Sequence, residues 1–203
     1  MIRKTAYALL FAAGAALTTA QPAKAEMEVA IFAGGCFWCV EADFDKVSGV
    51  VSTTSGYIGG RTENPTYYDH SSGGHREAVR IEFDNSRVSY DMLVSAFFHS
   101  IDPTDGGGQF CDRGHSYTTA VYTMNGAQAA AAEKAKQQAG RTLGTGIATD
   151  IVSASTFWPA EDYHQNYYRK NPVRYKYYRN GCRRDARLEQ VWGDDAMKGI
   201  RGS

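Results

Sequence analysis

Residues 28–46 read EVAIFAGGCFWCVEADFDK, and the fold is built outward from them. The apolar run that ends at Ala33 is typical of a short buried strand, and the two glycines after it favour a sharp break in the chain. From Phe37 to Lys46 the apolar residues recur at helical spacing, which predicts an amphipathic helix. Cys36 therefore lies at a helix start, among unpaired backbone N–H groups. The helix dipole there favours the thiolate form of cysteine, which is the nucleophile.

The rest of the chain mixes strand and helix patterns without strict alternation. This mixture predicts an α+β fold, a two-layer sandwich in which helices cover a mixed or antiparallel sheet. We expect a single domain with long irregular loops and an irregular tail. The patterns predict strands over 50–57, 77–83, 117–124 and 147–155, helices over 89–100, 126–138 and 162–169, and long loops over 59–74 and 102–116.

The first 25 residues have the order of segments found in a secretory signal peptide. A basic start precedes the apolar run 6–17, and Ala23-Lys24-Ala25 follows as a small-x-small cleavage pattern. The apolar run is shorter than a bilayer crossing needs, which favours a signal peptide over a membrane anchor. We therefore expect residues 26–203 to form an exported catalytic domain, periplasmic or secreted, with no membrane attachment after cleavage.

Charge gives no indication of a nucleic-acid partner. The formal net charge is zero, and removal of the three cations in residues 1–25 leaves about −3. We interpret the aromatic and arginine-rich segment near the C-terminus as a solvated surface rather than a platform for single-stranded nucleic acid. We also expect a monomer, because nothing resembles a dimer seam. The tyrosines of that segment are Tyr175, Tyr177 and Tyr178.

The four cysteines leave two interpretations open. Export permits two structural disulfides, but a domain of this size does not need them, so redox or nucleophilic roles are the alternative. Cys36 and Cys39 form a C-x-x-C pair, a spacing shared by redox dithiols and zinc sites. No second close pair exists, so we expect no metal and no cofactor. The other cysteines are Cys111 and Cys182, and we interpret two candidate ligands, His75 and His164, as structural.

Several motifs in a fixed order resemble those of the A-type peptide methionine sulfoxide reductases. Gly35-Cys36-Phe37-Trp38 is similar to the active-site signature of that family. Together the matches span nearly the whole mature chain, which makes them far more specific than a single C-x-x-C. The further matches are Ser55-Gly56-Tyr57, Asn64-Pro65-Thr66-Tyr67, Gly74-His75-Arg76-Glu77-Ala78-Val79, Asp112-Arg113-Gly114 with Tyr117, and Pro159-Ala160-Glu161-Asp162-Tyr163-His164-Gln165.

The resemblance implies a reaction and a substrate. Cys36 would attack the sulfur of methionine S-sulfoxide, in proteins or as the free amino acid, while Phe37 and Trp38 hold its methyl group. The products would be methionine and a sulfenic acid on Cys36.

The resemblance also implies four polar residues around the sulfoxide oxygen. Glu77 would donate a proton to it, Tyr67 and Tyr117 would hydrogen-bond it, and Asp112 is a further polar member. An acid is needed because an unprotonated oxygen leaves poorly. Burial beside apolar neighbours is expected to raise the pKa of Glu77 and keep it protonated.

The catalytic cycle requires a second thiol and an external reductant. We expect Cys39, close to Cys36 in sequence, to form the first disulfide. Cys182, in a tail that could swing in, would either replace Cys39 or relay the disulfide outward. Family members rely on a thioredoxin-like reductant, and we expect the same here. We assign Cys111 no role. The alternative function is a secreted thiol–disulfide oxidoreductase that uses only the C-x-x-C pair.

Overall fold

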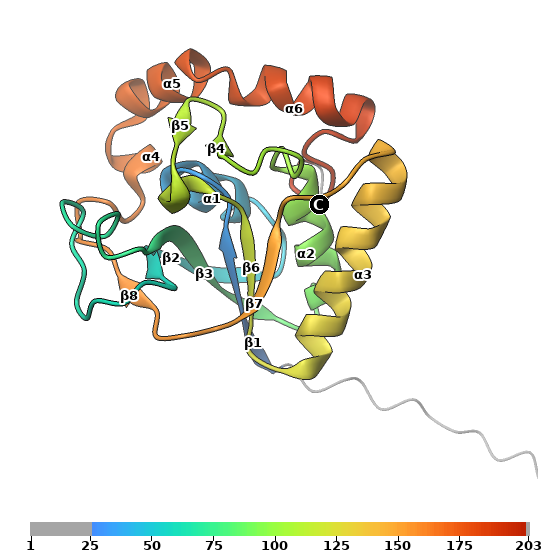
Figure 1. Cartoon of the computed structure of the whole chain (residues 1–203), viewed down its shortest axis with the longest axis horizontal. Coiled ribbons are helices and arrows are strands. Elements are labelled where there is room, and N and C mark those ends of the chain that lie inside the picture. The colour runs from blue at the N-terminus through green and yellow to red at the C-terminus, as the bar shows by residue number, and fades with distance from the viewer. Residues whose placement is uncertain (1–25, 202–203) are drawn as a thin grey trace, which may run out of the picture.

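The structure is a computed structural model that describes residues 26–201 (Figure 1). The predicted signal peptide, residues 1–25, therefore lies outside the described residues. Within residues 26–201, the helices are all too short or too polar to cross a bilayer.

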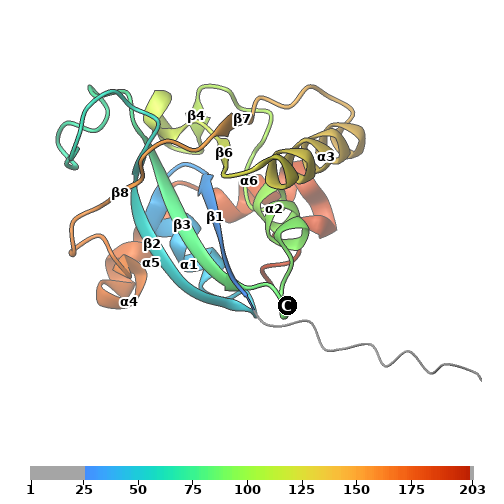
Figure 2. The same cartoon turned by 90° about the horizontal axis from the view of Figure 1, so that it is seen from below.

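Six strands form a single mixed sheet in the order β7-β6-β1-β3-β2-β8. Neighbouring strands are antiparallel except β6 and β7, which run parallel. Figure 2 shows the long strands β2, β3 and β1 side by side in that order. A small hairpin, β4 and β5, stands apart from this sheet. The strands are β1 Met27–Ala33, β2 Val50–Ile58, β3 Arg76–Asp84, β4 Gly108–Gln109, β5 Asp112–Arg113, β6 Ala120–Thr123, β7 Asp150–Ser153 and β8 Trp158–Pro159.

The helices cover one face of the sheet. Side chains alternate between the faces of a strand. In β1, Phe32 joins the main core that includes helical residues, while Ile31 joins a smaller cluster on the other face. This arrangement confirms the α+β prediction with a mixed sheet. The helices are α1 Phe37–Phe44, α2 Tyr90–His99, α3 Gly126–Leu143, α4 Tyr167–Lys170, α5 Pro172–Gly181 and α6 Arg184–Trp192, with 3₁₀ turns η1 His115–Tyr117 and η2 Gly193–Asp195.

The segment after Pro159 is more regular than the irregular tail we expected. It contains α4, α5 and α6, and Figure 1 shows the last two in red beside the β4–β5 hairpin. Arg179 of α5 donates to both oxygens of Asp43 in α1, at 2.9 and 3.0 Å, and both side chains are buried. Leu188 of α6 packs into the main core. These long-range contacts hold helices whose own sequence is mostly polar.

Candidate active site

The break between β1 and α1 places Cys36 at the N-terminal cap of α1. Gly35 has φ +82°, and a Cβ there would lie 2.6 Å from the Cβ of Gln109, so only glycine fits without displacement. Cys36 is 6 % exposed and lines a cavity of about 50 Å3. All seven residues to which the resemblance gives catalytic or substrate-binding roles line this cavity, together with one that it did not indicate. The lining consists of Cys36, Phe37, Trp38, Tyr67, Glu77, Asp112, Tyr117 and Tyr178.

Glu77 enters the cavity from β3. It lies two residues before Val79 in the strand, and side chains two residues apart point to the same face. Glu77 therefore points to the helix-covered face of the sheet, as Val79 does. The backbone N–H of Phe37 donates to Glu77 Oε2 at 2.9 Å, and the Tyr117 side chain also hydrogen-bonds the carboxyl. Burial, and after it the charge of Asp112, raises the pKa of Glu77 to about 8 although the hydrogen bonds oppose this. At neutral pH Glu77 is therefore mostly protonated and can act as an acid.

The expected thiolate at Cys36 is wrong for the resting site. Burial raises the pKa of the Cys36 thiol well above its ordinary value, and the neighbouring Cys39 and Glu77 raise it further. The helix dipole does not offset this, because α1 starts inside the core and its first N–H, that of Phe37, is bonded to Glu77. Cys36 is consequently a thiol at neutral pH and must lose its proton during the reaction.

Cys39 shares a hydrogen bond with Cys36. Its own pKa is lowered, first by that hydrogen bond and then by the positive charges of Arg184 and Arg179. Of the two thiols, Cys39 is therefore the one that ionises more readily.

An aromatic wall closes one side of the cavity. The Trp38 ring stacks on Tyr167 with centroids 3.8 Å apart, and its indole N–H donates to Nδ1 of His164 at 3.0 Å. Phe37 also contacts His164, with ring centroids 5.0 Å apart. His164 thus orients the wall of the cavity. His75 lies elsewhere, where it accepts a hydrogen bond from the Gly60 N–H and holds the loop after β2.

Tyr178 is the cavity residue that sequence reasoning missed. We expected a solvated surface there, but Tyr178 is half-buried, and its ring meets Trp38 edge-on at 5.7 Å. Its hydroxyl donates to Oδ2 of Asp112 and also hydrogen-bonds the Cys36 sulfur. Tyr177 does face solvent, at 83 % exposure. The available signal was helical spacing after Pro172, because residues 175, 178, 179 and 182 share one face of a helix.

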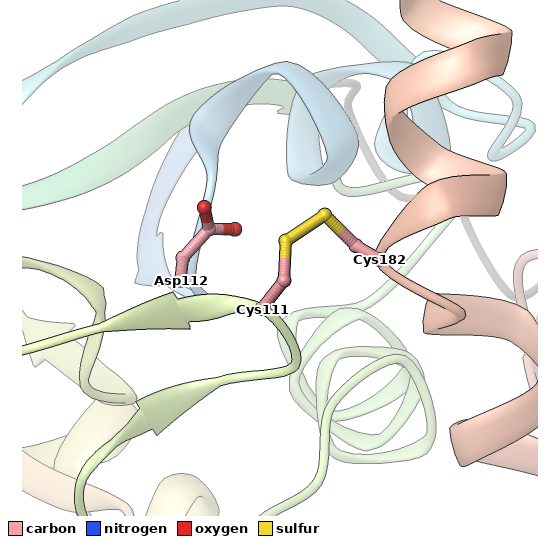
Figure 3. A group of neighbouring side chains, drawn as sticks. All are labelled: Cys111, Asp112 and Cys182. Atoms are coloured by element: carbon pink, nitrogen blue, oxygen red, sulfur yellow. A yellow bond between two sulfur atoms is a disulfide. The ribbon is translucent and has the colours of Figure 1, made fainter.

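Cys182 does not lie in a free tail. It caps the end of α5 and forms a disulfide with Cys111 of the β4–β5 hairpin, while Cys36 and Cys39 remain free thiols. Cys111, to which we assigned no role, is thus the partner of Cys182. Figure 3 shows the carboxylate of Asp112 beside the disulfide, and one of its oxygens lies within 4.8 Å of both sulfurs. That carboxylate lines the cavity with Cys36, so the hairpin places a disulfide and a cavity residue at adjacent positions.

Comparison with known proteins defines the class to which this fold and cavity belong. Residues 28–196 match the family described as peptide methionine sulfoxide reductase, and the chain belongs to that family of oxidoreductases. It is 57 % identical over 180 residues to peptide methionine sulfoxide reductase MsrA 2 of Rhizobium meliloti, covering 88 % of this chain and 91 % of the relative. The MsrA 2 of Caulobacter vibrioides is 49 % identical over 191 residues, covering 91 % and 97 %.

A solved structure agrees with these relatives. Methionine sulfoxide reductase A of Corynebacterium diphtheriae superimposes with a TM-score of 0.70 at 32 % identity, covering 78 % of this chain and 81 % of that one.

Proposed function

We propose that this enzyme reduces the S epimer of methionine sulfoxide, free or in exported proteins, with Cys36 as the nucleophile. The observation that carries the proposal is the cavity itself. It holds the Cys36 sulfur, a carboxyl protonated at neutral pH and an aromatic wall within one small volume. That combination matches the needs of a sulfoxide, which has a methyl group to seat and an oxygen to protonate.

The first half of the reaction uses the side chains that line the cavity. Glu77 gives its proton to the sulfoxide oxygen, and the hydroxyls of Tyr67 and Tyr117 hydrogen-bond that oxygen as charge develops. The Cys36 sulfur forms a bond to the substrate sulfur, and that S–S bond and the S–O bond then both break as the oxygen passes to Cys36. Methionine leaves, and Cys36 becomes a sulfenic acid. Phe37 and Trp38 provide the apolar surface for the methyl group.

The second half of the reaction returns Cys36 to the thiol. The Cys39 sulfur attacks the sulfenic sulfur and forms a Cys36–Cys39 disulfide, while the hydroxyl leaves as water with the proton of the Cys39 thiol. A reduced Cys111 and Cys182 pair then passes two electrons to that disulfide and becomes oxidised itself. The pairing seen here, with Cys36 and Cys39 free and Cys111 joined to Cys182, is the state that such a transfer leaves. A thioredoxin-like protein would reopen the Cys111–Cys182 disulfide, in which Cys111 is exposed.

The first 25 residues support a location outside the cytoplasm, because they resemble a signal peptide. In that compartment the substrates would be oxidised exported proteins, and the surroundings are oxidising, so a thioredoxin-like reductant must be supplied with electrons. We propose that the mature enzyme acts there as a monomer. Cell fractionation with a C-terminal tag tests the location, and a product that stays cytoplasmic with residues 1–25 attached would contradict it.

The test of the reaction is a single-turnover assay on cysteine variants, in which methionine formed and thiols lost are counted together. Cys36→Ser should form no methionine. Cys39→Ala should form one methionine per enzyme and leave Cys36 as a sulfenic acid. Cys182→Ser, the matched control, should form one methionine and still build the Cys36–Cys39 disulfide.

Two results of the same assay would contradict the proposal. One is a Cys36→Ser variant that is as active as the wild type. The other is thiol–disulfide exchange without sulfoxide turnover that is unaffected by Glu77→Gln, which would indicate an oxidoreductase that uses only the C-x-x-C pair.

A further inference from the structure

The hydroxyl of Tyr178 lies between the nucleophile and a carboxylate. It donates a hydrogen bond to Oδ2 of Asp112, and it also hydrogen-bonds the sulfur of Cys36. The three side chains come from α5, from the β4–β5 hairpin and from the start of α1, and all line the cavity. Because Cys36 is a thiol at rest, the reaction needs a group that takes its proton when the sulfur attacks.

We propose that Tyr178 passes the proton of the Cys36 thiol to Asp112 as the sulfur attacks the sulfoxide. This inference rests on the proposed function, since it supplies the deprotonation step that Cys36 requires. Because the Tyr178 hydroxyl gives its own proton to Asp112, its oxygen is left to accept the proton of the Cys36 thiol.

The proton transfers balance. The S–H bond of Cys36 breaks, and its proton goes to the Tyr178 oxygen, while the original hydroxyl proton of Tyr178 goes to Asp112. The sulfur keeps the electron pair and uses it to form the bond to the substrate sulfur. On the other side Glu77 loses its proton to the sulfoxide oxygen. Asp112 ends protonated and Glu77 ionised, and water that enters after product release returns the proton from Asp112 to Glu77.

The two carboxyl groups have environments that suit opposite tasks. Burial is the first cause that raises the pKa of Asp112, which makes its carboxylate a stronger base than a solvated one, while Tyr178 and Arg184 act in the opposite direction. Glu77 is more deeply buried and holds its proton near neutrality. A base and an acid on different sides of one nucleophile are what a concerted proton transfer requires.

Tyr178 is held in place by its neighbours in α5. The adjacent Arg179 is paired with the buried Asp43 of α1, and Cys182, about one helical turn further on, is joined to Cys111. Trp38 packs against the edge of the Tyr178 ring. The hydroxyl is therefore held close to the sulfur. A donor that is already in position needs little reorganisation when the proton moves.

Several other groups face the Cys36 sulfur, and the test must separate their effects from that of Tyr178. Cys39 and Glu77 raise the pKa of the thiol, and Tyr178 lowers it because its hydroxyl can donate a hydrogen bond to the sulfur once the sulfur is ionised. Tyr67 from the loop after β2, Tyr117 of η1 and Asp112 of the hairpin line the same cavity, and Arg184 of α6 lowers the pKa values of Asp112 and Cys39.

The experiment compares Tyr178→Phe with Tyr177→Phe, a change at the exposed neighbour in the same helix. The alkylation rate of Cys36 by iodoacetamide is followed against pH by mass spectrometry of its peptide. Single-turnover methionine formation and KM for methionine sulfoxide are measured on the same samples. Tyr178→Phe should shift the alkylation profile to higher pH and slow the turnover about tenfold to hundredfold, with KM nearly unchanged. Tyr177→Phe should behave as the wild type.

Asp112→Asn separates proton transfer from simple positioning, because an amide oxygen still accepts the Tyr178 hydrogen bond but does not take the proton. Its single-turnover rate should fall as far as that of Tyr178→Phe, without the shift of the alkylation profile to higher pH, and the double variant should be no slower than either single one. A Tyr178→Phe variant with the turnover and alkylation profile of the wild type overturns the inference. An Asp112→Asn variant with the single-turnover rate of the wild type also overturns the inference. This second test holds even if Tyr178→Phe does not fold.

The proposed function has a separate readout. If Cys36→Ser still reduces the sulfoxide, that function is wrong whatever Tyr178 does. If Cys36→Ser is inactive and Tyr178→Phe is unchanged, only the proton path is wrong.

Discussion

Replacement of Glu77 by Gln tests the acid in the cavity. The amide keeps the size of the side chain and an acceptor for the Phe37 N–H, but it has no acidic proton. With a pKa of about 8, about nine in ten Glu77 side chains are protonated at pH 7, against about 0.3 % at the ordinary value of 4.5. The site thus enriches the acid form about 300-fold. We expect the single-turnover rate of Glu77→Gln to fall by about 10²–10⁴ with a similar KM.

The pH profile is the sharper assay for the same residue. The reactive resting state has Glu77 protonated and Cys36 as a thiol, so the wild-type rate should fall as pH rises through about 8. Glu77→Gln should lose this decline. Glu82→Gln is the control, since Glu82 lies on the same strand with a partly exposed side chain bonded to Ser52 and Arg80. A Glu77→Gln variant with the wild-type rate, or with the same decline near pH 8, would refute the reasoning.

Glu77 also links stability to pH. Its folded-state pKa of about 8 lies above the ordinary 4.5. The contribution of this group to the free energy of unfolding is therefore fully present below pH 4.5 and is lost as pH rises through about 8. This pKa shift corresponds to roughly 5 kcal/mol in the free energy of unfolding. In urea unfolding, Glu77→Gln should therefore gain stability relative to the wild type between pH 5 and pH 9. A difference that stays constant over this range would contradict the burial cost.

Three further substitutions test the walls of the site. Trp38→Phe removes the indole N–H and much of the stacked surface, and should raise KM for methionine sulfoxide about tenfold; an unchanged KM would contradict a substrate-binding role. Arg179→Met removes the bidentate partner of the buried Asp43 and leaves it only the longer contacts to Lys46 and Arg184; it should lower the free energy of unfolding in urea by about 3 kcal/mol, whereas a loss below about 1 kcal/mol would show that those two cations suffice. Gly35→Ala forces a side chain into a φ of +82° and against Gln109, and should cost about 1–3 kcal/mol by the same measurement; full stability would show that the break can relax.

Much of the fold could be predicted because its signals are local. Ser89 precedes an amphipathic run, and its hydroxyl accepts from the Met92 N–H as a helix cap should. In β3 the apolar residues Val79, Ile81 and Phe83 alternate with others and define one face of the strand, and Glu77 lies on that same face. Its burial and raised pKa agree with the expectation drawn from its apolar neighbours, although the acid role itself came from the family resemblance.

The remaining features depend on contacts between distant segments. Tyr178 reaches Cys36 across 142 positions of sequence only because a buried ion pair fixes α5 on α1. The pairing of Cys111 with Cys182 depends on where the hairpin lies, which four cysteines alone do not specify. The predicted thiolate at Cys36 was wrong because it, too, depends on contacts between distant segments. A helix start indicates a thiolate only when it is solvated, and the core around Phe37 is a property of the assembled fold.

The Cys111–Cys182 bond joins residues that are 71 positions apart. A crosslink over a loop of that length restricts the unfolded chain and contributes about 4 kcal/mol of stability. Dithiothreitol, a common electron source for such assays, removes this crosslink along with any disulfide formed in turnover. Melting temperatures recorded in oxidising buffer and rates recorded in excess dithiothreitol would therefore describe two different covalent forms of the protein.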